Sequence, residues 1–186
     1  MNKQQRTKLI EYQQRAFTEG SVECINDQWV FFDEETEEAA LLDVWLHEEI
    51  EVFRLNRWRK GILCKDGKIQ KDQETIHLKD QDIVRIRKNL VFSLERLLEE
   101  VNDDAFYQFI TSLNTMDFSI YDCIYCYNQL TFLNDSKQKS GVNFIVFDNG
   151  ELICSVHHHF TYFEQTNDRF EFTLSTGKRM VIEKIG

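Results

Sequence analysis

The strongest constraint on the fold lies near the C-terminal end, where four β-type runs are separated by short turn sequences. Each run carries apolar side chains at strand-like spacing. Asp148, Asn149 and Gly150 form a type I′ hairpin signal between the first two runs. Because every connection is short, neighbouring strands are expected to pair in sequence order as an antiparallel meander. The predicted strands cover residues 142–147, 151–163, 170–174 and 179–185.

The segment before this meander has helical periodicity. Ser93 is the candidate N-cap of the first helix, and the run Asn102, Asp103, Asp104 both ends that helix and caps the second. Ser119 and Asp122 form a capping-box pattern at the start of a third helix. A polar tract over residues 134–141 then separates the helices from the strands. The sequence predicts helices over residues 90–101, 102–113 and 120–132.

The N-terminal half has mostly strand signals. Residues 4–17 predict a short helix, which Gly20 is expected to end, and a hairpin follows around Asn26 and Asp27. Residues 39–47 are compatible with a short helix or with a loop. Five short strands then follow in about 40 residues, joined by tight turns such as that at 66–67, which suggests a small SH3-like barrel or half-barrel.

The predicted fold class is therefore α+β. A small SH3-like, β-rich N-terminal module is followed by helices packed on a four-stranded antiparallel C-terminal meander. The expected boundaries are an N-terminal helix or arm over 1–19, a β-rich module over 20–89 and an α+β module over 90–186. Within the last module the helices cover 90–133 and the meander covers 142–185.

Composition bounds the environment of the chain. The N-terminal residues are polar, unlike a signal peptide, and the apolar runs are too short to span a membrane. The chain has five cysteines, an odd number that cannot all pair in disulfides within the chain. We therefore expect a cytoplasmic protein with reduced thiols and no membrane association. The net charge of −10 argues against general affinity for nucleic acid.

Charge is unevenly distributed within the N-terminal half. Residues 16–53 contain twelve acidic side chains and no Lys or Arg, whereas residues 54–88 contain eleven basic and five acidic side chains. Such asymmetry is compatible with a partner-binding face. The favoured interpretation is that the two segments pack together and neutralise each other, or that the charges simply form a solvated surface.

Two short motifs contain the residue types that bind zinc. Cys123 and Cys126 form a CxxC, and Cys154 and His157 form a CxxH. In a strand, however, Cys154 and His157 face opposite sides, and the CxxC falls inside a predicted helix rather than a knuckle. Core thiols are the alternative interpretation. A redox role for the CxxC is a further alternative, although the βαβ context of thioredoxin-like proteins is missing.

The run His157, His158, His159 is expected to place two rings on one face of a strand and one on the other. Outward histidines can bind a metal or transfer protons, but no nucleophile or carboxylate is placed beside them by the sequence. The meander register puts Cys154 and His158 on one face and His157 and His159 on the other.

The β-rich module contains a basic and aromatic set that is typical of nucleic-acid surfaces. Solvent-facing Arg and Lys on strands are the alternative interpretation. The set consists of Arg57, Trp58, Arg59, Lys60, Arg85, Arg87 and Lys88.

Four stretches form a recognisable combination: EGSVE at 19–23, NDQWVFFD at 26–33, FSIYDCIYCYN at 118–128 and RFEFTLSTGKR at 169–179. Together they resemble a family of uncharacterised proteins from Bacillus and related Firmicutes, classed as a domain of unknown function. The resemblance covers nearly the whole chain, and it implies no activity, cofactor or catalytic residue.

The leading functional hypothesis is a non-enzymatic cytosolic protein that acts through contacts with an unidentified protein partner, and a homo-oligomer is compatible with it. No cofactor and no catalytic residue is assigned. One alternative is a zinc- or redox-active protein that uses Cys123, Cys126, Cys154 and His157. A second alternative is a weak nucleic-acid binder that uses the basic β-rich module.

Overall fold

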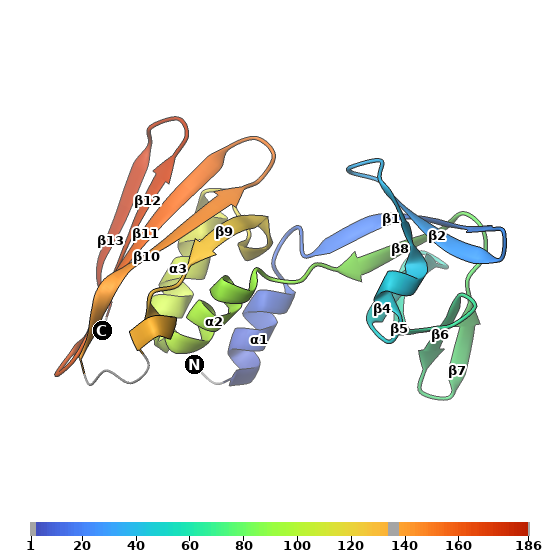
Figure 1. The fold of residues 1–186 in the computed structure, drawn as a ribbon, viewed down its shortest axis with the longest axis horizontal. Helices are drawn as coiled ribbons and strands as arrows, with labels where there is room; N and C mark the ends of the chain where they lie inside the picture. The colour runs from blue at the N-terminus through green and yellow to red at the C-terminus, as the bar shows by residue number, and fades with distance from the viewer. Residues whose placement is uncertain (1–2, 134–137, 186) are drawn as a thin grey trace. The chain divides into compact units, whose positions relative to one another are not determined.

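The computed structural model describes residues 3–133 and 138–185, and the chain forms two compact units (Figure 1). The larger unit combines Met1–Ala16 with Asn89–Gly186, and the smaller unit is Phe17–Lys88. The smaller unit is thus inserted into the sequence of the larger one. Its first and last strands are neighbours, with Phe17 opposite Arg87, so the chain enters and leaves the insertion at one place.

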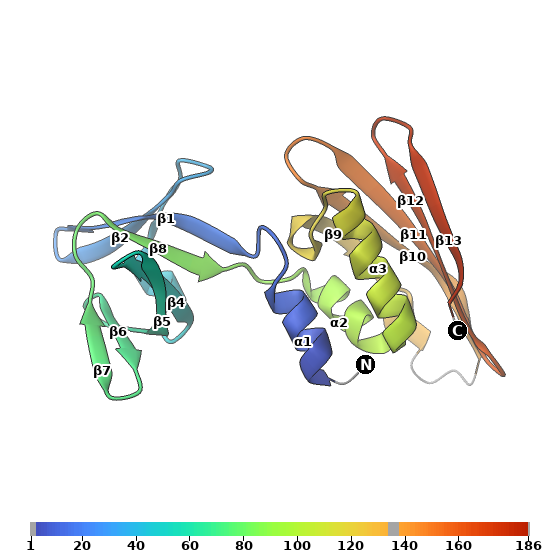
Figure 2. The same cartoon turned by 180° about the vertical axis from the view of Figure 1, so that it is seen from behind.

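The larger unit is built from helices, short 3₁₀ turns and five strands of one sheet in its described residues. These are α1 Lys3–Glu11, α2 Phe92–Glu100, α3 Asp103–Thr115, η2 Ile120–Asp122, β9 Cys123–Tyr127, η3 Leu130–Leu133, β10 Lys139–Asp148, β11 Ile153–Tyr162, β12 Thr166–Leu174 and β13 Arg179–Ile185. The strand order is β13-β12-β11-β10-β9, with every pair antiparallel. Helices α2 and α3 cover one face of this sheet (Figure 2).

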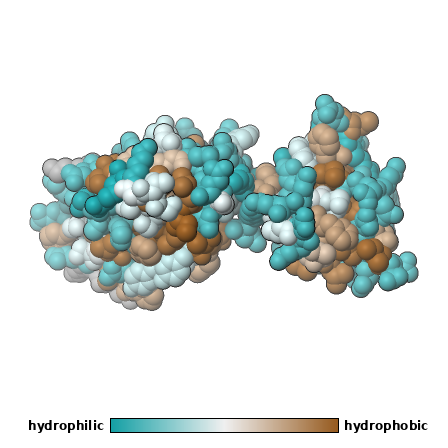
Figure 3. Space-filling model, turned by 90° about the horizontal axis from the view of Figure 1, so that it is seen from above, coloured by the Kyte–Doolittle hydropathy of each residue, from teal (hydrophilic) through white to brown (hydrophobic). Residues whose placement is uncertain are grey.

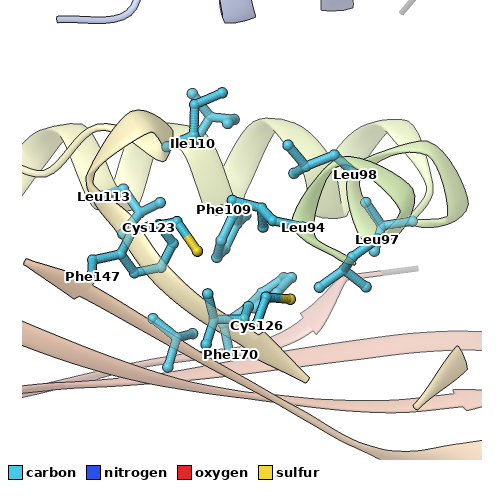
Figure 4. Packing of buried hydrophobic residues seen from close by; sticks show 14 of the residues in the cluster. Leu94, Leu97, Leu98, Phe109, Ile110, Leu113, Cys123, Cys126, Phe147 and Phe170 are labelled. Carbon is cyan, nitrogen blue, oxygen red and sulfur yellow. The ribbon is translucent and has the colours of Figure 1, made fainter. Parts of the chain in front are cut away.

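The core of the larger unit lies between the helices and the sheet. It is rich in phenylalanine, with Phe109 in contact with the rings of Phe147, Phe170 and Phe172 at centroid distances of 5.2–6.2 Å (Figure 4). Large rings bury 150–250 Å² each, so this cluster contributes a major part of the hydrophobic stabilisation. The α+β class is as predicted.

The meander β10–β13 pairs in sequence order, but the sheet has five strands rather than four. The additional strand is β9, and the predicted third helix over 120–132 is therefore wrong. Ser119 and Asp122 do form the predicted capping box, yet the helix that they cap is a single 3₁₀ turn.

A β-bulge explains why β9 looked helical. Tyr125 pairs with Val146 and Cys123 with Phe147, so Ile124 is an extra residue without an opposite partner. The bulge turns both Cys123 and Cys126 toward the core at a spacing of three. That spacing imitates one face of a helix.

The predicted type I′ turn at Asn149 and Gly150 is also wrong. Asp148 pairs with Ile153, so the loop has four residues, and only Gly150 of these two has a positive φ. The side chain of Asn149 instead accepts hydrogen bonds from the backbone N–H groups of Glu151 and Leu152 at 3.0 and 2.8 Å. The faces of β11 are nevertheless as predicted, with Cys154 and His158 inward.

Helix α1 ends at Glu11, six residues earlier than predicted, and Arg15 has a left-handed φ of 54°. Two arginines attach this N-terminal segment to the larger unit. Arg6 donates to the Asp103 carboxylate and to the Leu98 and Val101 carbonyls at the end of α2. Arg15 donates to both carboxylate oxygens of Asp122 at 2.8–3.0 Å.

The smaller unit is one eight-stranded antiparallel sheet of order β3-β2-β1-β8-β4-β5-β6-β7. Residues 39–47, predicted as helix or loop, form a short strand and a 3₁₀ turn. The elements are β1 Phe17–Ile25, β2 Gln28–Asp33, β3 Ala39–Leu41, η1 Leu42–Trp45, β4 Glu49–Arg54, β5 Arg57–Cys64, β6 Lys68–Lys71, β7 Glu74–His77 and β8 Asp82–Arg87.

The core of the smaller unit is mainly aliphatic, and Phe31 is the phenylalanine among its buried residues. Two of its hairpins have two-residue loops with positive φ at both positions, the backbone of a type I′ turn. These loops are Asn26-Asp27 and Leu55-Asn56. Helices that could cross a membrane are absent from the described parts of both units.

Candidate functional site

The structure separates the residues of the proposed zinc site. Cys123, Cys126 and Cys154 lie in the core on the helix-facing side of the sheet. Phe147 is opposite both Cys123 and Cys154, one strand away from each, which separates these two backbones by about 10 Å. His157 lies on the other face, where its ring is 5.1 Å from that of Phe144.

The environment of the three thiols disfavours the thiolate that binds metals and attacks disulfides. Burial raises the pKa of Cys123 and of Cys126 to about 12. Burial likewise raises the pKa of Cys154 to about 11. No group of three or more His, Cys, Asp or Glu side chains in residues 3–133 and 138–185 is arranged to hold a metal ion. The thiols therefore act as small apolar core residues.

A buried polar cluster lies elsewhere in the larger unit, and the sequence did not predict it. His158 and Asp168 are fully buried on adjacent strands, with Nε2 of the ring 2.7 Å from Oδ1 of the carboxylate. Tyr162 donates its hydroxyl to the same oxygen at 2.5 Å, and Asn102 donates its amide to the other oxygen at 2.7 Å. Asn143 lies 3.0 Å from the second ring nitrogen, Nδ1.

The hydrogen-bond pattern defines the role of each atom in this cluster. Asn143 accepts the backbone N–H of Gln129 through Oδ1, so its Nδ2 is the atom that donates to His158 Nδ1. Nε2 of His158 must then carry the hydrogen that Asp168 accepts. A general base needs one nitrogen free for its substrate. Both nitrogens are occupied here, so the cluster resembles a catalytic dyad but acts as a structural connection.

Asn102 connects this cluster to a helix. Its Oδ1 accepts the backbone N–H of Ala105 and caps α3, as predicted, while its Nδ2 contacts the Asp168 carboxylate. Burial, with the Asp168 carboxylate beside the hydroxyl, raises the pKa of Tyr162. The tyrosine therefore remains a neutral donor. The cluster orients α3 on the sheet.

The basic set of the smaller unit is divided by the structure. Lys60 forms an ion pair with Glu49 at 2.6 Å, and Arg85 pairs with Glu51 at 2.6 Å. Two longer pairs at 3.8 Å join Arg85 to Glu19 and Lys88 to Glu35. All four pairs connect the basic half of the unit with its acidic half. These four ion pairs thus neutralise part of the charge asymmetry between residues 16–53 and 54–88 within the unit itself.

A surface groove lies beside the edge strand β9. The groove has a volume of about 200 Å³, and its lining includes Phe92, Arg96, Cys126, Tyr127 and Phe132. Phe92 and Phe132 are each 74% exposed, and the rings of Tyr127 and Phe132 stack at 6.2 Å. We call this feature the β9 groove. Exposed aromatic groups beside an arginine are typical of the energetic centres of protein interfaces.

The fold and these sites define a two-unit α+β protein whose larger unit buries His158, Asp168 and three cysteines in its interior. The chain belongs to the family described as "Protein of unknown function (DUF2777)", which matches residues 4–184. It is 29% identical over 178 residues to "Uncharacterized protein YisN" of Bacillus subtilis (strain 168), covering 95% of this chain and 90% of that protein. The resemblance to an uncharacterised Bacillus family is thereby confirmed. No solved structure matches the chain.

Proposed function

We propose that this protein is a non-enzymatic cytosolic protein that acts through protein–protein contacts, and that the β9 groove is its docking site. The observation that carries the proposal is the exposed aromatic groove at the edge of the five-stranded sheet. Exposed aromatic side chains are removed from water when another molecule covers them, and this burial favours binding.

The partner that this geometry fits is an extended segment of another protein. Strand β9 pairs with β10 on one side and ends the sheet on the other, so a sixth strand can add to it through backbone hydrogen bonds. The groove offers an apolar site for one large side chain of that segment. Ile124 and Tyr125 extend the exposed apolar surface along the same strand.

Figure 3 shows that hydrophobic residues interrupt the hydrophilic surface, as they do on most soluble proteins. The β9 groove differs from such scattered residues because its aromatic side chains line one depression. The zinc and redox alternatives are weaker, since the three thiols are buried and protonated. The nucleic-acid alternative is weaker, since Lys60, Arg85 and Lys88 already contact carboxylates.

The test compares affinity capture from native cytosol, with cross-linking, for three forms of the full chain. These are the wild type, the groove variant Tyr127→Ser/Phe132→Ser and the matched control Phe163→Ser, which changes an exposed phenylalanine of the same unit outside the groove. We expect a stoichiometric partner with wild type and control, cross-linked to residues 123–132, and none with the groove variant. Recovery of no stoichiometric partner, or its retention by the groove variant, would contradict the proposal. Cross-links to a second copy of the chain would show that the groove binds another copy of this protein instead of a different partner.

The finer architecture of the smaller unit forms part of this proposal. We infer an SH3-like, partly closed sheet, an architecture that commonly binds peptides. The inference is supported by short strands joined by tight turns around one aliphatic core that includes Val22, Val52, Leu63, Ile69 and Val84.

A further inference from the structure

The smaller unit contains a basic pocket that is distinct from its neutralised surface. The pocket has a volume of about 250 Å³, and Arg57, Arg59 and Lys71 contribute three cations to its lining. Glu74 is the carboxylate among the lining residues. Within the described parts of the chain, none of the three cations forms an ion pair. Lys60, which is on the same strand as the two arginines, is paired with Glu49.

The pocket arises where two strands separate. Strand β5 pairs with β6 only over Ile62–Cys64, so its residues 57–61 have β4 on one side and no strand on the other. At Gly61 the two strands are very close, since a Cβ there would lie 2.6 Å from Ile69 Cγ2 and 2.8 Å from the Gln70 carbonyl oxygen. Beyond this contact the β6–β7 hairpin diverges from β5 (Figure 1). Trp58 and the buried Ile76 contribute the apolar part of the lining.

We infer that this pocket binds a compact oxyanion with two or more negative charges, such as a phosphate group or a pair of carboxylates. Guanidinium groups form bidentate, charge-assisted hydrogen bonds with such groups, and Lys71 on β6 adds a third cationic donor to the lining. The three cations against one carboxylate leave an excess of positive charge that a doubly charged anion would neutralise.

A compact anion fits this site better than a polynucleotide. Binding of a nucleic acid requires a track of cations that contacts successive phosphates. Here Lys60, Arg85 and Lys88 each contact a carboxylate, so they do not extend the three cations of the pocket into a continuous basic track. The net charge of −10 also opposes approach of a long polyanion. The anion can be a free small molecule or an acidic group on a protein.

The test is a titration of the ¹⁵N-labelled full chain, followed by the amide chemical shifts of residues 57–76. Inorganic pyrophosphate represents a free anion, a short oligoglutamate peptide represents a protein-borne anion, and a single-stranded DNA oligonucleotide represents the polyanion. The variants are Arg57→Gln/Arg59→Gln and the control Lys60→Gln. The control also removes one positive charge from β5, but its side chain points to the other face of the sheet.

We expect saturable binding of pyrophosphate or of the peptide that weakens roughly tenfold or more in the double variant and less than about twofold in the control. The tighter of these two ligands identifies the source of the anion. Should the double variant lose its folded spectrum, Lys71→Gln in the exposed hairpin takes its place. Unsaturable binding, an equal loss with Lys60→Gln, or tighter binding of the oligonucleotide would each overturn the inference.

Discussion

The two units of this protein differ in where they place polar and aromatic side chains. The larger unit packs seven phenylalanines into its core and buries the His158–Asp168 pair among them. The smaller unit has a mainly aliphatic core and forms exposed or half-exposed ion pairs such as Lys60–Glu49 and Arg85–Glu51 on its sheet. A buried carboxylate is costly to deprive of its hydrogen-bond partners, whereas an exposed ion pair contributes little. We therefore expect the larger unit to depend on a few specific contacts and the smaller unit to tolerate the loss of many.

Tryptophan and cysteine residues are distributed so that the unfolding of each unit can be followed separately. All three tryptophans, Trp29, Trp45 and Trp58, belong to the smaller unit, so tryptophan fluorescence follows the unfolding of that unit. The buried thiols Cys123, Cys126 and Cys154 belong to the larger unit, so their exposure follows the other.

The largest expected effect is a difference in thiol reactivity. Cys24 is exposed and Cys64 half-buried in the smaller unit, whereas the three thiols of the larger unit are buried. If opening of the larger unit costs about 4 kcal/mol or more, its thiols react on the order of 1,000-fold more slowly than Cys24. Labelling with a thiol reagent at pH 8, read by mass spectrometry with peptide mapping, measures the ratio. Rapid native labelling of Cys123 or Cys126 would contradict the core assignment.

The same thiols give the larger unit a defined response to alkali. Their pKa values are raised in the folded unit, to about 11 or 12, above the ordinary value of the unfolded chain near 8.5. Above pH 9 the unfolded state therefore binds fewer protons than the folded one, and stability falls as pH rises toward 11. The replacement of all three cysteines by alanine is expected to flatten this slope. Urea titrations at pH 8, 9 and 10 test it.

The next largest effect is expected for Asp168→Ala. The substitution leaves His158, Tyr162 and Asn102 without their common acceptor in a fully buried site, and we expect a loss of about 3–5 kcal/mol in the larger unit. Urea unfolding followed by thiol exposure measures this loss. The exposed Glu164→Ala serves as the control. A loss below about 1 kcal/mol would mean that the buried pair does not stabilise the fold.

Arg15→Met is expected to have a smaller effect. The arginine makes three hydrogen bonds to the buried Asp122 carboxylate, and their removal is expected to cost about 2 kcal/mol and to detach the N-terminal segment. Limited proteolysis within residues 3–16, together with thiol exposure, measures both consequences. Arg179→Met, which removes an exposed pair with Glu171, is the matched control and is expected to change little.

In the smaller unit, Arg85→Met is expected to cost only about 1 kcal/mol. The guanidinium pairs with Glu51 and lies 4.2 and 4.3 Å from the rings of Phe17 and Trp58, but it is partly exposed. Tryptophan fluorescence during urea unfolding measures the change. A cost equal to that of Asp168→Ala would remove the distinction between the two units.

The smallest effect is a gain. Leu55 has a φ of 53° in a two-residue hairpin loop, a conformation that disfavours a residue with Cβ, and it is 83% exposed. Leu55→Asn is expected to stabilise the smaller unit by about 0.5 kcal/mol, because asparagine tolerates this backbone best among residues with a side chain. Leu55→Ala removes the same apolar group without this tolerance, so any equal gain there would assign the effect to hydrophobic exposure.

The sequence predicted well those features that depend on local patterning. The β10–β13 pairing and the Asn102 cap follow from alternation and from a short polar side chain before a helix. Strand β9 was missed because one bulge at Ile124 shifts the phase of the inward residues. A strand is recognised by inward-facing residues at every second position, and a single bulge residue breaks this alternation.

The buried His158–Asp168 pair was missed for a different reason. Asp168 lies outside the predicted strands 151–163 and 170–174, but in the structure it continues the inward alternation of Phe170, Phe172 and Leu174 backward along β12. That alternation in the sequence could have predicted that Asp168 faces the core. Charge compensation between the two halves of the smaller unit was one of three open interpretations. Its resolution required the three-dimensional register that puts Glu51 opposite both Arg85 and Lys60.

The inserted position of the smaller unit has a consequence for synthesis. Helix α1 leaves the ribosome before the smaller unit, but its anchoring partners Leu98, Val101 and Asp103 are translated only after the whole insertion. At about 5–20 residues per second, the nascent N-terminal segment waits several seconds for its binding site. During that interval Phe17–Lys88 can complete its own sheet, because β1 and β8 enclose all of its strands in sequence. The unit that is inserted into the sequence of the larger one is therefore expected to fold before it.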